Sequence, residues 1–263
     1  MMRRSAARPA APSLCQDGAV VSHVARYRAG EQDDVWRDLR ALGLRVFDEP
    51  HREDALAVAH EMALRARRNV ETLVERLEAD GFAARQNDDD ETPRAAHLPP
   101  GPDAEGLAAW AETELAPFPM TVAAWIRTVG DVWLVGDHPR WPESVLADPL
   151  VVELEHSSHG GGAREYYAEE WRRWRADPDP VEGFQLDFAP DALHKASISG
   201  DGPYGIQLPG EGIDGRVGPA LWFVDDLNNA FAAGGFPEEL RDEGYVDPPA
   251  GLREALARDL LRL

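Results

Sequence analysis

Cysteine and lysine are almost absent from this sequence, since Cys15 and Lys195 are the only residues of their types. One cysteine excludes an internal disulfide and a cysteine-based zinc site, and its place near the N-terminus argues against thiol catalysis. This cysteine usage permits a reducing compartment, and we expect the protein in the cytoplasm. The other basic side chains are arginines, a bias that we attribute to genome composition rather than to chemistry.

Long apolar runs are missing as well. No stretch approaches the roughly 20 consecutive apolar residues of a membrane-spanning helix. Arg3 and Arg4 precede Leu14 and Cys15, but the apolar segment of a secretory signal does not lie between them. We therefore predict that residues 1–30 form a disordered or extended tail and that the protein has no membrane partner.

Positive charge is scarce relative to negative charge. The chain has 27 Lys and Arg against 48 Asp and Glu, and its formal net charge is −21. Such a surface repels nucleic acid and anionic membranes and attracts basic partners. We therefore expect a protein partner, with a basic one favoured. The alternative is that the acidity only gives solubility.

The first half of the chain is predicted to be helical. Within residues 31–83, one stripe of apolar residues recurs at helical spacing: Met62, Ala66, Val70, Leu73, Val74 and Leu77. A stripe of this kind usually packs on a core. Residues 84–106 combine a run of acidic residues with several prolines, which predicts a solvated acidic loop.

The second half mixes short strands with helices. Phe184, Leu186 and Phe188 alternate with polar residues, as in a half-buried strand. Further strands are predicted at 132–135, 150–154, 205–208 and 221–224, and helices at 107–115, 122–129, 166–175 and 225–232. The helix at 122–129 is expected to end at Gly130. Helices first and mainly strands later favour an α+β fold. We expect a mainly antiparallel sheet with flanking helices over residues 107–263, packed with residues 31–83 as one domain.

Two motifs that often mark chemistry are incomplete. Residues 200–205 spell G-x-G-x-x-G, but Pro203 and Pro209 prevent the helix that would hold a dinucleotide phosphate, so we assign the glycines to a tight turn. His60 begins the zinc motif H-E-x-x-H, but Leu64 replaces the second histidine. We therefore predict no catalytic residues and no cofactor.

Glu153, His156 and His159 form the best metal candidate in the sequence. Carboxylate and imidazole groups suit zinc or another divalent ion. Three glycines follow at 160–162, so the ligands would sit on a loop without rigid support, and a polar loop at the sheet edge is the favoured interpretation. A metal-dependent enzyme that uses these residues stays open as an alternative.

One predicted helix is rich in aromatic residues and arginine. Tyr166, Trp171 and Trp174 lie on it among several arginines. Tryptophan, tyrosine and arginine are typical anchors of protein interfaces. The same side chains would also pack the helix on the sheet while the arginines reach water, and both interpretations stay open.

Two dense segments carry a family resemblance: 118–136 (FPMTVAAWIRTVGDVWLVG) and 191–209 (DALHKASISGDGPYGIQLP). They resemble the SUKH superfamily of cell-wall assembly regulator-like and bacterial immunity-type proteins. A later segment, FAAGGF at 231–236, is similar to the F-x-W-G-G-F ending of these proteins, with Ala233 in place of tryptophan. The residues that lead into the first segment, 116–121, depart from the family pattern. The resemblance covers about residues 62–237.

The resemblance implies an antiparallel sheet with helices against it and a binding role rather than a catalytic one. In bacteria many members look like immunity proteins that neutralise toxins. We therefore expect a non-catalytic protein-binding module, an immunity-type protein that neutralises a toxin or another basic partner. A scaffold or regulatory interaction protein is the alternative, beside the metal-dependent enzyme named above. The predicted partner-binding residues are Tyr166, Trp171, Trp174, His194, Lys195 and Tyr204.

Overall fold

The structure is an α+β fold in which helices precede antiparallel sheets, as the sequence predicts. The computed structural model describes residues 22–87, 92–155, 162–178, 183–200, 202–218, 220–238 and 240–263. Its α-helices are α1 (His23–Arg28), α2 (Gln32–Leu42), α3 (Arg52–Ala79), α4 (Ala104–Glu114), α5 (Met120–Thr128), α6 (Ala163–Ala176), α7 (Ala192–Lys195), α8 (Phe223–Ala232) and α9 (Leu252–Ala257). Short 3₁₀ helices add η1 (Gly43–Phe47), η2 (Pro142–Ala147) and η3 (Arg241–Glu243).

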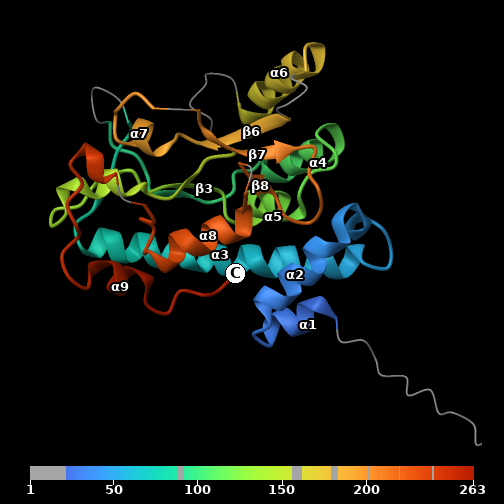
Figure 1. Cartoon of the computed structure of the whole chain (residues 1–263), viewed down its shortest axis with the longest axis horizontal. Helices are drawn as coiled ribbons and strands as arrows, with labels where there is room; N and C mark the ends of the chain where they lie inside the picture. Colours follow the sequence, from blue (N-terminus) through green and yellow to red (C-terminus); the bar gives the residue numbers. More distant parts are fainter. Residues whose placement is uncertain are drawn as a thin grey trace, which may run out of the picture.

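The strands of the described residues pair in antiparallel sheets. One sheet joins β1 (Ala83–Ala84) to β4 (Gly136–Asp137), and a second has the order β2 (His97–Leu98), β3 (Asp131–Trp133) and β5 (Val151–Val152). The largest has the order β6 (Phe184–Ala189), β7 (Tyr204–Leu208), β8 (Arg216–Val217) and β9 (Leu221–Trp222). The Glu153 N–H, just after β5, donates to the Phe188 carbonyl of β6 at 2.8 Å. The second and the largest sheet therefore meet where β5 lies beside β6. Figure 1 shows the strands between the long helix α3 and helix α6.

Helix α3 supplies much of the core. The predicted apolar stripe is confirmed, since its members are buried, apart from the partly buried Val74. One cluster of buried apolar side chains extends from Tyr27 to Leu263, so the helical segment and the sheet region share one core. Within it α3 packs on α5, and α5 packs on α8.

Polar groups join parts of the chain that are distant in sequence. The Arg40 guanidinium of α2 lies 2.6 Å from Asp214 Oδ2 and 2.9 Å from Asp225 Oδ2. The Asp214 side chain is fully buried, so this ion pair neutralises a carboxylate that water cannot reach. On α3, the buried Asn69 accepts the N–H of Leu261 at 2.7 Å and donates to its carbonyl at 2.8 Å.

The prediction of a disordered or extended tail over residues 1–30 is wrong for the residues that form α1. Residues 1–21 lie outside the described residues, but α1 occupies His23–Arg28. The Ser22 hydroxyl caps this helix by accepting the N–H of Ala25, and Tyr27 is buried edge-on against Trp36 at 5.8 Å. The burial of one tyrosine, which the sequence pattern does not show, orders this segment.

The predicted loop over residues 84–106 also contains regular structure. Residues 88–91 lie outside the described residues, but on either side of them β1 pairs with β4, and β2 pairs with β3. Each strand has only two residues, which is too short for a visible alternation of apolar and polar side chains. Near the other end of the chain, the strand predicted at 221–224 stops at Trp222, and α8 begins at Phe223.

Gly130 ends α5 and turns the chain into β3. Its φ is +83°, and a Cβ atom at this position would overlap the carbonyl oxygen of Leu98. Only glycine permits both this backbone conformation and this close approach. The helix end that the sequence predicts at Gly130 is therefore confirmed, and the close approach places β2 against β3.

Candidate functional site

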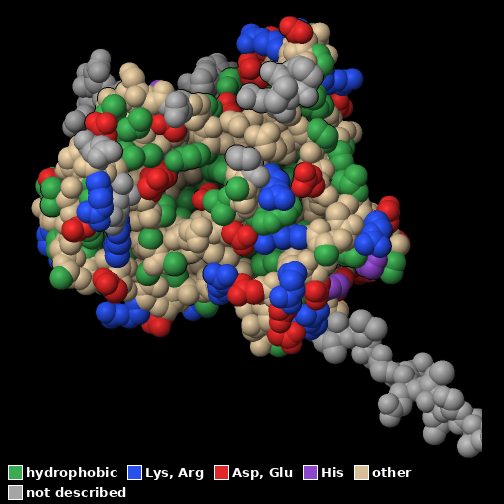
Figure 2. All heavy atoms as spheres, viewed as in Figure 1, with side chains coloured by type: hydrophobic (Ala, Val, Ile, Leu, Met, Phe, Trp, Pro, Cys, Tyr) green, Lys and Arg blue, Asp and Glu red, His purple; other side chains and the backbone are tan. Residues whose placement is uncertain are grey.

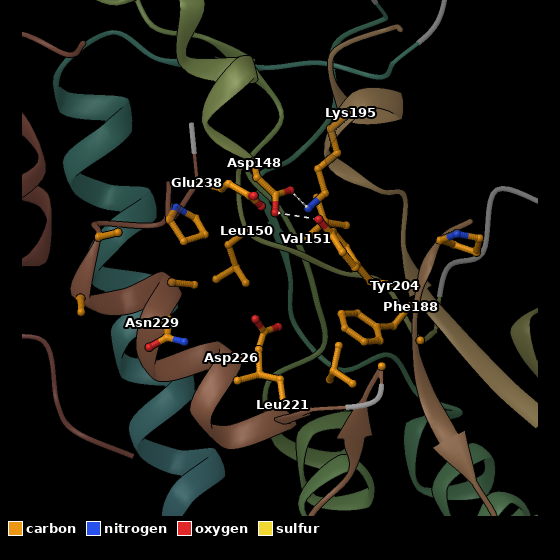
Figure 3. A pocket seen from close by; sticks show the side chains of 18 of the residues that line it. Asp148, Leu150, Val151, Phe188, Lys195, Tyr204, Leu221, Asp226, Asn229 and Glu238 are labelled. Carbon is orange, nitrogen blue, oxygen red and sulfur yellow. Dashed lines mark hydrogen bonds and ion pairs between the residues drawn. The ribbon is translucent and has the colours of Figure 1, made fainter. Parts of the chain in front are cut away.

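A cavity of about 770 Å³ opens between the sheet, the short helix α7 and helix α8. Its lining comes from segments far apart in the sequence: Asp148 and Leu150 after η2, Val151 of β5, Phe188 of β6, Lys195 of α7, Tyr204 of β7, and Asp226 and Asn229 of α8. The close view shows these side chains around a common space (Figure 3). In the space-filling view, the corresponding face is hollowed, with acidic and hydrophobic side chains around the depression (Figure 2). A cavity of this size is large enough for a small molecule or for a side chain of a partner protein.

One wall of the cavity is a buried ion pair with a tyrosine beside it. The Nζ atom of Lys195 lies 2.6 Å from Asp148 Oδ1, and the Tyr204 hydroxyl donates to Asp148 Oδ2 at 3.1 Å. The side chains of Lys195 and Asp148 are 4% and 11% exposed. The Lys195 ammonium also lies 4.9 Å from the centre of the Tyr204 ring. Burial, followed by the charge of Asp148, raises the pKa of the Tyr204 phenol, so this hydroxyl stays protonated.

The local backbone structure directs the side chains of Lys195 and Asp148 toward each other. Asp191 caps α7 by accepting the N–H groups of Leu193 and His194, and Lys195 at the end of this short helix reaches across to η2. Asp148 follows η2 with a φ of +46°, a left-handed conformation that aspartate tolerates better than most residues. This conformation directs the Asp148 carboxylate toward Lys195 (Figure 3).

Asp226 faces the same space but has no comparable partner. Within the described part of the chain it makes no hydrogen bond and no ion pair. Burial raises the pKa of Asp226 to about 6, while the charge of Lys195 lowers it and that of Asp148 raises it further. Figure 3 shows its carboxylate pointing into the cavity from α8. At neutral pH this side chain is therefore an ionised carboxylate without a counter-ion.

Much of the remaining lining is apolar, Gln185 and Asn229 add neutral polar groups, and Glu238 adds a further acid. Leu150, Val151, Phe188 and Leu221 supply hydrocarbon and aromatic surface. Glu238 is exposed and lies close enough to Tyr204 to help raise the pKa of its phenol. The lining thus has three acidic side chains, Asp148, Asp226 and Glu238, against one basic side chain, Lys195, which gives a formal net charge of −2.

The cavity holds two of the six predicted partner-binding residues, Lys195 and Tyr204. The attribution of the lysine bias to composition alone is incomplete, because the single lysine of the chain forms the buried ion pair of this cavity. A compact ammonium fits beside Asp148 and Tyr204, whereas a guanidinium is a larger, planar fork.

Two other predicted residues, Tyr166 and His194, line a neighbouring cavity of about 450 Å³. The two cavities share Phe188 and Pro203 in their linings. His194 is half-exposed and its Nδ1 pairs with Asp191, the residue that caps α7. His194 and Lys195 are successive residues of a helix, so their side chains point in different directions and line different cavities.

Trp171 and Trp174 of α6 lie apart from the central cavity. Their rings stack at 5.1 Å, and Trp171 packs edge-on against Phe184 of β6 at 5.0 Å. Both side chains are partly buried against the core. The geometry therefore favours the packing interpretation for these two residues over the interface interpretation.

The metal candidate is only partly described. His156 and His159 lie outside the described residues, while the Glu153 carboxylate lies 3.2 Å from the Arg94 guanidinium. Across the described ranges, no group of three or more histidine, cysteine or acidic side chains is arranged to hold a metal ion. Glu153 is thus engaged in an ion pair rather than directed toward an open metal position.

The glycine motif at residues 200–205 does not lead into a helix. Tyr204 and Gly205 begin strand β7, as expected for a turn rather than a phosphate-binding loop. A Cβ atom at Gly205 would overlap the Gln185 side chain of β6, so this glycine permits close pairing of the two strands. His60 is exposed on α3, which agrees with its interpretation as a polar-face residue.

Comparison with protein-family models, with curated proteins and with solved structures finds no match to this chain. The resemblance to the SUKH superfamily therefore rests on the sequence motifs given above. Over the residues that the structure describes, no helix is both long enough and apolar enough to cross a membrane.

Sequence reasoning missed the acidic half of the site. Asp148 precedes Pro149, and Asp226 stands in the first turn of α8, where aspartate is common for helix stability alone. Glu238 lies in a loop after that helix. The local sequence gives no signal that these three carboxylates converge.

Proposed function

We propose that this chain is a non-catalytic binding module for a basic protein and that it acts as an immunity-type protein toward a toxin domain. The observation that carries the proposal is the cavity with a net charge of −2, in which Asp226 has no counter-ion among the described residues. A cationic group of a partner would supply that counter-ion. The net charge of −21 would speed association with such a partner.

The motif resemblance supports the same function. The segment at 191–209 contributes Lys195 and Tyr204 to the cavity, and His194 to its neighbour. The chemistry of the central cavity also favours binding over catalysis. Its lysine is neutralised by Asp148, and its tyrosine keeps its proton because the pKa of the phenol is raised, so neither is an activated nucleophile.

The test begins with an affinity capture from the native lysate at low salt and at about 0.5 M salt, because a steered electrostatic complex weakens as salt rises. A captured basic protein is then purified and its Kd is measured. The cavity variant Asp226→Asn/Glu238→Gln is compared with a control of equal charge, Asp103→Asn/Glu78→Gln, whose sites are exposed and outside the cavity. We expect the cavity variant to bind at least about tenfold more weakly than the control.

The immunity role has its own readout. The captured partner, expressed alone in a bacterial host, should arrest growth, and coexpression of the wild-type chain should restore it. If the captured partner does not arrest growth on its own, the proposed toxin-neutralising function is rejected. If the cavity variant and the control variant bind the partner with equal affinity, the cavity is not part of the binding surface.

A further inference from the structure

The central cavity differs from a generally acidic surface because one of its carboxylates is already paired with a cation and another is not. Asp148 is satisfied by Lys195 and by Tyr204, so it offers little to a second cation. Asp226 stands on the opposite side of the space, with no partner among the described residues (Figure 3). One carboxylate is therefore left as the acceptor for one incoming positive group, with Glu238 at the rim.

The walls around that carboxylate suit a long side chain with a planar cation. Leu150 and Leu221 offer hydrocarbon surface for methylene groups, and Phe188 adds aromatic surface. A guanidinium is more weakly hydrated than an ammonium, stacks on aromatic rings, and binds a carboxylate with two parallel hydrogen bonds. An ammonium enters a partly apolar cavity at a greater desolvation cost and makes only a point contact.

We infer that the central cavity accepts one arginine side chain of the partner, whose guanidinium pairs with Asp226 while its methylene groups contact Leu150 and Leu221. The inference rests on the proposed function, since it specifies the chemistry by which a basic partner is recognised. In this arrangement the charge of Asp148 is balanced by Lys195, so the guanidinium is directed to Asp226. Glu238 at the rim attracts the approaching cation and excludes anionic side chains.

The test uses a probe that needs no partner protein. Acetyl-Ala-Arg-Ala-amide is titrated into the isotopically labelled chain, and backbone amide shifts are followed by NMR at low salt and near neutral pH. The matched probes are the same tripeptide with lysine and with norleucine. We expect saturable shifts at the amides of Asp148, Leu150, Val151 and residues 226–230. The lysine probe should bind at least about fivefold more weakly, and the norleucine probe should have no effect.

Two variants locate the binding. Asp226→Asn should weaken the arginine probe at least about tenfold, whereas Asp103→Asn, at an exposed position outside the cavity, should leave its affinity within about twofold of the wild type. Shifts that do not saturate, that appear elsewhere, that are equal for lysine, or that survive Asp226→Asn would overturn the inference.

The outcome separates this inference from the function on which it rests. If a basic partner is captured but the arginine probe does not bind, the proposed binding function is supported and recognition through an arginine side chain is rejected. If the probe binds specifically but no basic partner is captured, the guanidinium site is supported and a basic protein as the partner is rejected.

Discussion

Replacing Asp226 by asparagine should make the protein more stable near neutral pH. In the folded chain the Asp226 carboxylate has no counter-ion among the described residues, and burial raises its pKa to about 6 from an ordinary value of 3.8. The neutral amide is close in size to the protonated acid, so the substitution removes the unfavourable charge and keeps the shape. Under the proposed function the variant would lose binding affinity and gain stability, as expected where a binding group is held in an unfavourable environment.

The size of the effect follows from linkage between protonation and folding. A difference of about two pKa units corresponds to about 3 kcal/mol at a pH well above both pKa values, because each unit is worth about 1.36 kcal/mol. The side chain is partly exposed, so water screens part of the charge. We expect the free energy of unfolding of Asp226→Asn to exceed that of the wild type by about 2 kcal/mol at about pH 7.5.

The sign of the pH dependence is fixed by the direction of the shift. A carboxyl group whose pKa is raised in the folded state stabilises the fold when it is protonated, and this stability is lost as the pH rises through about 6. The wild type therefore loses stability between about pH 4 and pH 7 through this group, and the variant does not. The advantage of the variant should shrink below pH 6 and approach zero near the ordinary pKa of aspartate, 3.8.

Urea denaturation at several pH values gives the measurement, with Asp103→Asn as the exposed control. In a separate thermal denaturation near neutral pH, the melting temperature of Asp226→Asn should rise by about 5 °C, as a change of about 2 kcal/mol implies for a chain of this size. A variant that is no more stable than the wild type at about pH 7.5, or whose advantage is the same at about pH 4, would refute the reasoning.

Four further substitutions test the packing and the ion pairs. Asp148→Asn leaves the Lys195 ammonium buried without a counter-ion and should cost about 3 kcal/mol; a second change, Lys195→Met, should recover most of that loss in urea titrations. Gly130→Ala should cost about 3 kcal/mol or more, since φ is +83° and the added Cβ overlaps the Leu98 carbonyl; an unchanged calorimetric midpoint would contradict this. Arg40→Met leaves two aspartates without their cation and should cost about 3 kcal/mol by chemical denaturation, with full stability as the contrary outcome.

Elements with a long repeating pattern were predictable from the sequence. The apolar stripe of α3 and the alternation in β6 repeat the same local preference over many residues, so both appear in the structure. Gly130 was recognisable as a helix end because glycine alone adopts the conformation that the turn requires. The segment 191–209 likewise drew attention to Lys195 and Tyr204, and both line the cavity.

The sequence by itself determined the α+β class, the long core helix and the strong negative charge, because each depends on local periodicity or on composition. Only the tertiary structure decided the site. Asp148, Lys195 and Asp226 come from segments separated by 30 residues or more, and no local pattern encodes their meeting. Packing decided which carboxylate is neutralised and which is left without a partner, because burial and distance set the cost of each charge.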